Sequence, residues 1–358
     1  MNVYISEFTG LGNSILIRNA VKKLKKKLLN IDFHYFGDNK YKSFELLEND
    51  DSFKNFINIK SLGGIYRLLK MPPGYIIVTS SSFIPFKYLF IILLFSKSIF
   101  VTDLYNLKKQ NFFKRLVLNF LFYLRDKIER KTSILDITNI NLHEILVNYN
   151  LIAKIFHIDQ IKNVENIDKL NFTQNKQILD KFGLKSQKYI CFQPNCSSGN
   201  KSPKNWPDKN VLDFLNNYSF SDYKLVLIGE KNENRDFYNN FSGLVNLIGK
   251  TSIYDLPNIL FYSKLIVAVE GGIVHLSEAL EKKVICLWGP SDMRKNQPVR
   301  NSTEIIKYNL PCAPCCISWI PEEKRTEIDF FHDCKINIQC MRSINYLDIN
   351  NKINNILS

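Results

Sequence analysis

The chain has 358 residues and a formal net charge of +14, so it is too long for one ordinary core and fits two domains of ordinary size. Its 45% apolar and 23% charged residues exclude a disordered or fibrous chain. The most apolar run, residues 88–95, is far short of the ~20 residues that span a bilayer.

Most of the positive charge lies in the first half of the chain. Residues 1–150 hold 22 Lys and Arg against 12 Asp and Glu, which gives +10 and leaves +4 for residues 151–358. A basic half predicts an anionic partner: a phosphorylated glycolipid, an anionic membrane face or a nucleic acid. Biased codon usage and a solvated helix face at residues 22–27 are the alternative explanations. No nucleic-acid-binding motif accompanies the charge, so we expect no nucleic acid partner.

The amino-terminal residues form a unit of strand, glycine loop, helix and strand. Residues 3–6 are typical of a strand, and a helical pattern with a lysine face begins at Ile15. Met1 leads directly into this strand without a signal sequence, so we expect a cytoplasmic protein. Gly10 and Gly12 lie in the loop. Ile15 occupies the third glycine position of the dinucleotide fingerprint, which disfavours a dehydrogenase.

The rest of the first half alternates between strands and helices. We expect strands at residues 75–79 and 98–102, with a very apolar helix at residues 86–95. Residues 40–70 are poorly patterned, which predicts a loop-rich insertion. Residues 111–130 form an amphipathic helix with aromatic and basic side chains. Such a helix lies on a membrane surface or packs on the core with a solvated face.

A polar linker at residues 157–177 leads to the second half, where a strand is followed by a long loop at residues 194–207. The hydroxyls of Ser197 and Ser198 can donate hydrogen bonds to a diphosphate. The ammonium group of Lys204 can neutralise the charge of a departing diphosphate.

A further strand at residues 223–228 ends at Gly229, and Glu233 follows shortly after. One interpretation of Glu233 is a Glu at a helix amino terminus, which the helix dipole favours.

Residues 264–290 contain a strand, a glycine turn, a helix and a second buried strand. Gly271 and Gly272 lie where the first strand ends and the helix begins. Open α/β sheets bind ligands at this position, and a helix amino terminus attracts phosphate. Glu270 and His275 flank the turn and can add side-chain contacts. A capping or packed histidine is the alternative for His275.

Four cysteines near the carboxyl terminus have spacing that suits metal ligands. They are Cys312, Cys315, Cys334 and Cys340. Structural zinc is one interpretation, but the later pair lacks the tight spacing of a zinc ribbon. We favour reduced thiols, and we expect no metal and no cofactor.

These motifs resemble glycosyltransferase family 9, the heptosyltransferases of lipopolysaccharide core assembly. The family has Asp, a small residue, Gly, two variable residues and His, which residues 270–275 match with Glu270 in place of Asp. Its Lys-x-Trp-Pro loop matches residues 204–207, and its Phe-Gly-Pro after the next strand matches residues 288–290 with Trp288. The resemblance implies donor contacts from Ser197, Ser198, Lys204, Gly229, Glu233, Glu270, Gly271, Gly272 and His275. It also implies that Glu233 contacts the ribose of the nucleotide.

In that family an Asp in the first glycine loop is the proposed general base that deprotonates the acceptor hydroxyl. Asn13 occupies this position here. An amide cannot take a proton in this pH range, so Asn13 can only orient the acceptor. Glu7 at the end of the first strand is our first substitute, and Glu270 is the second. A surface carboxylate is the alternative for Glu7.

The resemblance implies an α/β protein of GT-B type, with two Rossmann-like parallel-sheet domains facing an interdomain cleft. We expect an acceptor-binding domain at residues 1–160, a nucleotide-sugar-binding domain at residues 175–340 and a carboxyl-terminal helix at residues 341–358 that packs back on the first domain.

The implied function is inverting transfer of a heptose or related sugar from a nucleotide-diphosphate donor of the ADP-heptose type. The acceptor would be an anionic glycolipid of the lipopolysaccharide core or another surface glycan, with peripheral contact at the inner face of the cytoplasmic membrane. A catalytically inactive nucleotide-sugar-binding protein is the alternative, and Asn13 supports it.

Overall fold

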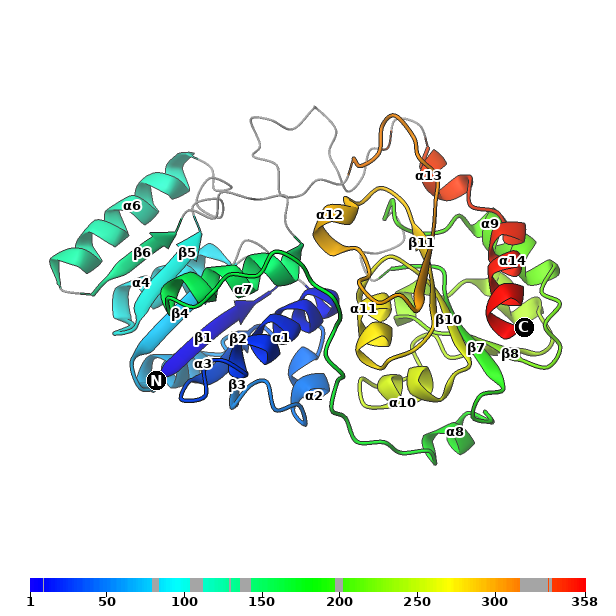
Figure 1. The fold of residues 1–358 in the computed structure, drawn as a ribbon, viewed down its shortest axis with the longest axis horizontal. Coiled ribbons are helices and arrows are strands. Elements are labelled where there is room, and N and C mark those ends of the chain that lie inside the picture. The colour runs from blue at the N-terminus through cyan, green and yellow to red at the C-terminus, as the bar shows by residue number, and fades with distance from the viewer. Residues whose placement is uncertain are drawn as a thin grey trace. The chain divides into compact units, whose positions relative to one another are not determined.

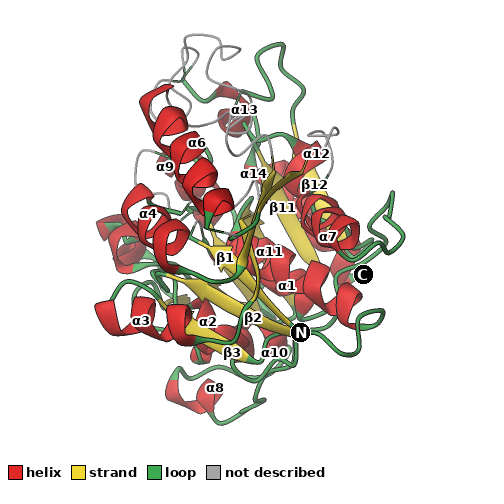
Figure 2. Ribbon diagram, turned by 90° about the vertical axis from the view of Figure 1, so that its left-hand side faces the viewer, coloured by secondary structure: helices red, strands yellow, loops and turns green. Residues whose placement is uncertain are grey.

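The structure is a computed structural model that describes residues 1–8, 10–78, 84–103, 112–128, 130–135, 143–196, 202–315, 334 and 337–358. The chain divides into two compact units, and the first gives way to the second between Val164 and Glu165 (Figure 1). Each unit contains a six-stranded sheet. All strand pairs in both sheets are parallel, and helices cover the sheets (Figure 2).

The sheet of the first unit has the strand order β3-β2-β1-β4-β5-β6. Its strands are β1 (Asn2–Glu7), β2 (Asp32–Gly37), β3 (Asn55–Asn58), β4 (Gly74–Val78), β5 (Ile99–Asp103) and β6 (Thr132–Leu135). Its helices are α1 (Leu11–Lys25), α2 (Ser43–Leu47), α3 (Leu62–Lys70), α4 (Phe86–Phe95), α6 (Phe112–Lys127) and α7 (Glu144–Ile155).

The two faces of this sheet are covered by separate groups of helices. Helices α3, α4 and α6 pack in a row, and α1 packs on α7. Tyr4 joins the buried cluster that also contains residues of α3, α4 and α6. Since side chains alternate along a strand, the buried Val3 and Ile5 point to the opposite face. Both faces are therefore apolar, as a parallel sheet requires.

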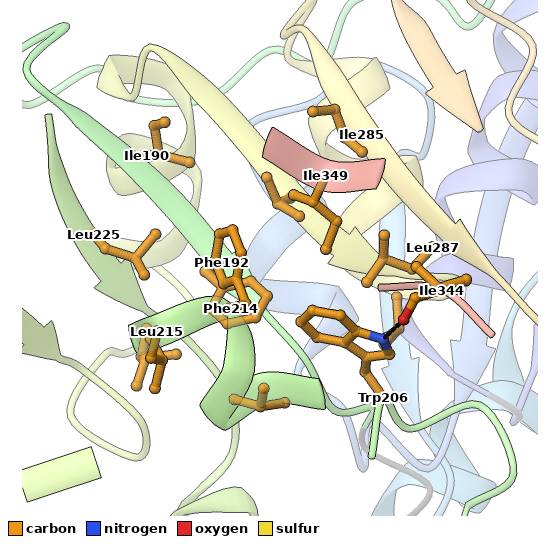
Figure 3. Packing of buried hydrophobic residues seen from close by; sticks show 14 of the residues in the cluster. Ile190, Phe192, Trp206, Phe214, Leu215, Leu225, Ile285, Leu287, Ile344 and Ile349 are labelled. Carbon is orange, nitrogen blue, oxygen red and sulfur yellow. Dashed lines mark hydrogen bonds between the residues drawn. The ribbon is translucent and has the colours of Figure 1, made fainter. Parts of the chain in front are cut away.

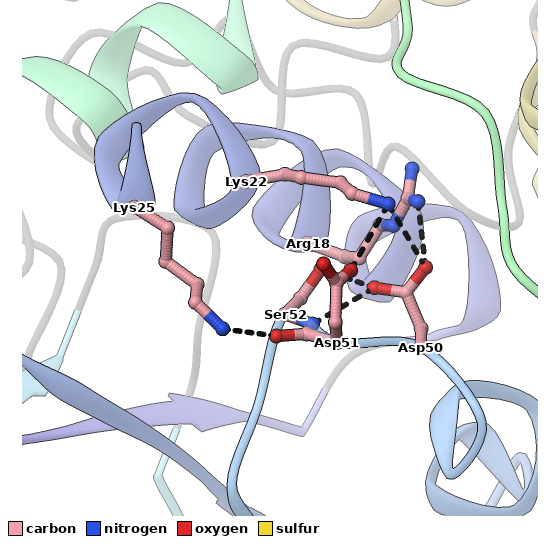
Figure 4. Close-up of polar contacts among 6 residues, drawn as sticks. All are labelled: Arg18, Lys22, Lys25, Asp50, Asp51 and Ser52. Carbon is pink, nitrogen blue, oxygen red and sulfur yellow. Dashed lines mark hydrogen bonds and ion pairs between the residues drawn. The ribbon is translucent and has the colours of Figure 1, made fainter. Parts of the chain in front are cut away.

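The basic face of α1 is fastened to the turn before β3 (Figure 4). Arg18 Nη2 lies 2.6 Å from Asp50 Oδ2, and both side chains are fully buried. Lys22 Nζ lies 3.1 Å from Asp51 Oδ1, and Lys25 donates to the backbone carbonyl of Asp51. This part of the lysine run therefore holds the helix on the sheet and is not only a solvated face.

The loop-rich insertion expected at residues 40–70 is wrong, because this segment forms α2, β3 and α3. Each element is at most nine residues long, too short for a sustained hydrophobic period. Ser61 caps α3 by accepting a hydrogen bond from Gly64 N at 3.1 Å. A Cβ on Gly64 would collide with the Asn58 carbonyl, so glycine allows α3 to lie close to β3.

The sheet of the second unit has the strand order β12-β11-β10-β7-β8-β9. Its strands are β7 (Tyr189–Gln193), β8 (Lys224–Leu227), β9 (Leu244–Asn246), β10 (Leu265–Val269), β11 (Val284–Trp288) and β12 (Thr303–Lys307). Its α-helices are α8 (Ile178–Lys181), α9 (Asp208–Asn216), α10 (Asp255–Tyr262), α11 (Gly272–Ala279), α12 (Met293–Asn296), α13 (Gln339–Arg342) and α14 (Tyr346–Leu357). Two short 3₁₀ helices are η1 (Lys231–Glu233) and η2 (Asp236–Asn240).

The closing helix α14 packs in the second unit, against α9, β11 and β12, where we had expected it to pack on the first domain. Trp206 explains this position (Figure 3). Its indole N–H donates to the Ile344 carbonyl at 3.0 Å, just before α14 begins. Ile349 and Ile353 of α14 are fully buried in the same apolar cluster as Trp206. This cluster on one face of the sheet therefore holds the carboxyl-terminal segment.

Among the helices that the structure describes, none is both long enough and apolar enough to cross a membrane.

Candidate functional site

The strand order of the second sheet creates a topological switch point between β7 and β10. From β7 the chain continues to β8 and β9 on one side of the sheet. It then returns to β10, β11 and β12 on the other side. The loops after β7 and β10 therefore leave the sheet in opposite directions from neighbouring carboxyl ends. Open α/β sheets bind their ligands at such a point.

The glycine turn after β10 lies at this switch point and opens α11. Gly271 is the residue before the helix and has no side chain to cap the first turn. Its backbone conformation is rare for other residues, and no atom of the described residues lies within 4 Å of where a Cβ would be. The first turn contains no acidic residue, so the N–H groups of this turn and the positive end of the helix dipole can bind an anion.

Glu270 joins the two loops of the switch point. Its Oε1 accepts hydrogen bonds from the backbone N–H groups of Gly289 and Ser291, each at 3.3 Å. Its Oε2 lies 3.4 Å from Lys204 Nζ, and the Glu270 side chain is 3% exposed against 24% for Lys204. Two motifs that lie 66 residues apart in the sequence are therefore in contact, and the buried carboxylate holds the lysine ammonium at the switch point.

The loop that carries Lys204 is fixed at both of its described ends. Trp206 N donates to the Pro194 carbonyl at 2.8 Å, and Cys196 N donates to Asn205 Oδ1 at 2.9 Å. These bonds bring the strand end close to the start of α9 and limit the positions that Lys204 can reach. The predicted donor residues Ser197 and Ser198 lie outside the described residues.

His275 lies one turn into α11 and is 5% exposed. Its Nδ1 lies 3.6 Å from Oε2 of Glu278 on the next turn of the helix. Glu278 is fully buried, and its Oε1 accepts from the backbone N–H groups of Val299 and Arg300, each at 2.8 Å. The sequence reasoning missed Glu278. Its helical i+3 spacing from His275, on an otherwise apolar helix, was the available signal.

The two glutamates also shape the electrostatics inside the sheet. Burial raises the pKa of the Cys286 thiol in β11 well above its usual range, and the charges of Glu270 and Glu278 raise it further. The thiol is therefore protonated at neutral pH and acts as a small apolar group between the two carboxylates.

Glu233 is the last residue of η1, which follows β8. Its side chain lies beside Gly229, because a Cβ on that glycine would collide with the Glu233 carboxylate. The residue is 1% exposed, and neither carboxylate oxygen has a hydrogen-bond partner among the described residues. Burial, with the charge of Glu230 as the second cause, raises the pKa of Glu233 to about 8. At neutral pH the carboxyl group is therefore mostly protonated, so it can donate as well as accept a hydrogen bond.

The first unit has a similar arrangement, because its sheet has a switch point between β1 and β4. Gly10 precedes α1, and the first turn of this helix contains no acidic residue. Asn13 lies in that first turn and is half-buried. Glu7 ends β1, paired with Gly37 of β2. The structure does not describe the Glu7 side chain.

The four cysteines lie near one another in the second unit. Burial, together with the neighbouring Cys315, Cys334 and Cys312, raises the pKa of Cys340 to about 12. Cys312 is exposed, whereas Cys340 is buried. Within the described ranges, no group of three or more His, Cys, Asp or Glu side chains is arranged to hold a metal ion.

Comparison with known proteins places these motifs in a family. A sequence model of glycosyltransferase family 9 (heptosyltransferase) matches residues 134–324, just over half of the chain. Lipooligosaccharide heptosyltransferase 2 of Campylobacter jejuni serotype O:2 is 25% identical over 156 residues, which are 41% of this chain and 46% of that protein. A second strain's protein of the same name is 24% identical over 156 residues. The chain thus spans less than half the length of the curated relatives it matches.

Solved structures share the fold over the whole chain. The structure described as ADP-heptose lps heptosyltransferase II of E. coli has a TM-score of 0.70 at 14% identity, covering 100% of this chain and 98% of that one. A family 9 glycosyl transferase from Veillonella parvula has a TM-score of 0.68 at 13% identity, covering 99% and 97% of the two chains. E. coli heptosyltransferase WaaC, solved with ADP, has a TM-score of 0.65 at 13% identity, covering 99% and 100%. The predicted GT-B class with two parallel-sheet units is therefore confirmed.

Proposed function

Because the chain belongs to glycosyltransferase family 9, we propose that it transfers a heptose or related sugar from a nucleotide-diphosphate donor to a surface-glycan acceptor. The observation that carries this proposal is the contact between Lys204 and Glu270 at the switch point of the second sheet, beside the open amino terminus of α11. This arrangement presents a fixed cation and several N–H groups to one anionic ligand.

The diphosphate of the sugar donor would lie against the first turn of α11 and the Lys204 ammonium. The hydroxyls of Ser197 and Ser198 would donate further hydrogen bonds to it. The partly protonated carboxyl of Glu233 beside Gly229 would bind a ribose hydroxyl. His275 would contact the donor from α11. The related WaaC protein has been solved with ADP and with ADP-2-deoxy-2-fluoro heptose. An ADP-heptose type of donor is therefore our first candidate.

Transfer would be one in-line displacement at the anomeric carbon, with inversion. The acceptor oxygen forms the new bond while the bond from the anomeric carbon to the diphosphate oxygen breaks, and the electron pair leaves with the diphosphate. Lys204 and the helix dipole would stabilise the charge that develops on the leaving group.

The acceptor hydroxyl must also lose its proton. Glu270 already accepts two backbone hydrogen bonds and pairs with Lys204, so we assign it to positioning Lys204. Asn13 cannot take a proton, which leaves Glu7 at the end of β1 as our candidate base. The first unit, whose residues carry most of the net positive charge, would bind an anionic glycolipid acceptor.

Asn13 also supports a second candidate function, that of a nucleotide-sugar-binding protein without turnover. An active enzyme needs a proton acceptor at the acceptor hydroxyl, and the family position for that group holds an amide in this chain. Under this alternative the donor site would be intact, and Asn13→Asp would gain turnover that the natural protein lacks.

The test is a calorimetric titration of the full protein with nucleotide diphosphates and their sugar conjugates, with ADP-heptose first. We expect Lys204→Ala to weaken binding of one conjugate about 10- to 100-fold, because a charge-assisted hydrogen bond contributes about 1.5–3 kcal/mol. His275→Ala should weaken it less. Lys352→Ala is the matched control, because Lys352 pairs with Glu304 in the same unit.

Binding that Lys204→Ala and His275→Ala weaken, and that Lys352→Ala leaves unchanged, supports the donor site. Turnover assays with anionic glycolipid acceptors then separate the enzyme from the inactive binder. If no conjugate binds, the proposal is wrong.

A further inference from the structure

Helix α6 is apolar on two opposite faces, and among the described residues only one of these faces is buried. Leu118, Leu121 and Phe122 are buried against the first sheet. Four large side chains on the other face are exposed to solvent, and their spacing of three, four and three residues forms one stripe along the helix. We call them the α6 stripe; they are Phe113 (72% exposed), Leu116 (51%), Phe120 (59%) and Tyr123 (57%).

The helix is held firmly, so the stripe is not the result of a loosely placed segment. Buried Arg125 donates from Nη1 to the Leu93 carbonyl at 2.6 Å and from Nη2 to the Ser98 carbonyl at 2.7 Å. These bonds fix the last turns of α6 to the end of α4 and the start of β5. Exposed Phe95 lies at that same end of α4, which adds apolar surface beside the helix.

The charge around the stripe is positive. Residues 112–131 contain six Lys and Arg against two Asp and Glu, and of the six only Arg125 is buried in the structure. Lys127 Nζ lies 5.4 Å from the centre of the Tyr123 ring, so a cation and an aromatic ring meet at the end of the stripe. Protein interfaces are depleted in lysine, whereas helices that lie in a membrane interface combine Phe and Leu with flanking Lys and Arg.

We infer that the α6 stripe and its flanking basic residues dock the protein on the surface of a bilayer that contains anionic lipids. The apolar rings enter the boundary between headgroups and acyl chains, and the lysines pair with anionic headgroups. An anionic glycolipid acceptor already implies contact with a membrane, and in that respect the docking surface rests on the proposed function. Vesicle binding is measured without any sugar donor, so its failure and the failure of the donor site are distinguishable.

The experiment is co-sedimentation of the full protein with vesicles of phosphatidylcholine alone or of phosphatidylcholine with phosphatidylglycerol. We expect binding to the anionic vesicles only, and weaker binding as salt is raised. The double variant Phe113→Ser/Phe120→Ser should bind the anionic vesicles about tenfold more weakly, because two aromatic rings are no longer transferred from water into the bilayer. Its donor affinity should equal that of the natural protein.

A matched control removes a similar apolar surface elsewhere. Leu29 and Tyr254 are 84% and 52% exposed and lie outside α6, so Leu29→Ser/Tyr254→Ser should bind vesicles as the natural protein does. If Phe113→Ser/Phe120→Ser unfolds, Lys127→Glu supplies a second test. This variant should bind the anionic vesicles more weakly than the natural protein does, because one cation is replaced by an anion. Equal loss in the control, no binding to anionic vesicles, or a dimer that only the stripe variant dissociates would overturn the inference.

Discussion

At the scale of single residues, Glu270 makes the contacts that hold the switch point together. It is 3% exposed and accepts from two backbone N–H groups while it pairs with Lys204. Glu270→Ala leaves both donors without a partner, so we expect the free energy of unfolding to fall by about 2–4 kcal/mol. Glu270→Gln keeps an acceptor oxygen and should cost about 1 kcal/mol. Urea unfolding measures both losses.

The exposed pair of Glu304 and Lys352 gives the comparison for Glu270. Glu304→Gln breaks an ion pair in the same unit but leaves no buried donor, so its cost should stay below about 1 kcal/mol. A Glu270→Ala cost as small as this would show that solvent reaches the Gly289 and Ser291 N–H groups.

Glu233 should make stability depend on pH. Its pKa of about 8 in the folded protein exceeds the ordinary value of 4.5, so the folded state binds more protons than the unfolded state between those pH values. The free energy of unfolding should therefore fall as pH rises from 5 to 8, by at most about 1.4 kcal/mol per pH unit from this group. Urea unfolding of the natural protein and of Glu233→Gln measures this slope.

The glutamine variant is the control, because its side chain has the same shape and stays neutral at every pH. As pH rises, the free energy of unfolding of the natural protein should fall relative to that of Glu233→Gln. Below pH 4.5 the difference between the two free energies should be constant. Parallel curves for the two proteins would show that Glu233 is ionised in the folded state.

At the scale of elements, Arg125 joins α6 to α4 and β5. Burial lowers the pKa of Arg125 to about 10, so the guanidinium is still charged at neutral pH and can donate to the Leu93, Ser96 and Ser98 carbonyls. Arg125→Met removes all three hydrogen bonds, and we expect a loss of about 2–4 kcal/mol in the free energy of unfolding. Amide exchange in α6 should become faster.

Arg115→Met on the same helix is the control, since Arg115 is half-exposed and its loss should cost less than about 0.5 kcal/mol. Equal costs for the two variants would mean that the carbonyls near Ser96 find water when the guanidinium is removed.

The elements with long, regular patterns were predictable from the sequence. The apolar strand before Glu270 and the next buried strand form as expected, because each shows one period from end to end. The closing helix also forms, but it begins at Tyr346 and not at residue 341. Strand β6 has only four residues, and α7 buries Glu144, Asn148 and Asn150. A four-residue strand is too short to show a period, and buried polar side chains hide the apolar face of a helix, so neither β6 nor α7 was predicted.

The place of α14 could not be predicted from its own sequence, because an amphipathic helix can pack on any apolar surface. The surface it packs on is set by Trp206, which lies 138 residues before Ile344 in the chain. Asn210 donates to the same carbonyl at 2.8 Å. Contacts between residues this far apart in sequence leave no local pattern.

At the scale of the whole molecule, the site was predictable where one stretch of chain builds it. The glycine turn and the helix after it are local features, and the structure places both as expected. The contact between Lys204 and Glu270 depends on β7 and β10 being neighbours, which follows from the strand order. Glu278 accepts hydrogen bonds from the backbone N–H groups of Val299 and Arg300 in a loop. No sequence motif predicts such a contact.

The proposed donor site assigns the ligand to one of the two units, which gives a prediction for the full protein. ADP at 100 times its dissociation constant stabilises the state that binds it by about 2.7 kcal/mol. Because bound ligand makes local opening less favourable, amide exchange should slow in the residues that surround the ligand. We expect protection at residues 202–206, 229–233, 270–275 and 289–291, because these segments end neighbouring strands of the second sheet.

Hydrogen exchange followed by mass spectrometry measures this protection peptide by peptide. Lys204→Ala should lower the protection factors about 10- to 50-fold at the same ADP concentration, as 10- to 100-fold weaker binding requires, whereas Lys352→Ala should leave them unchanged. Residues 10–19, at the similar switch point of the first unit, should exchange equally with and without ADP, because that site is assigned to the acceptor. Protection confined to residues 10–19 would reverse the assignment, since at both switch points a glycine precedes a helix whose first turn contains no acidic residue.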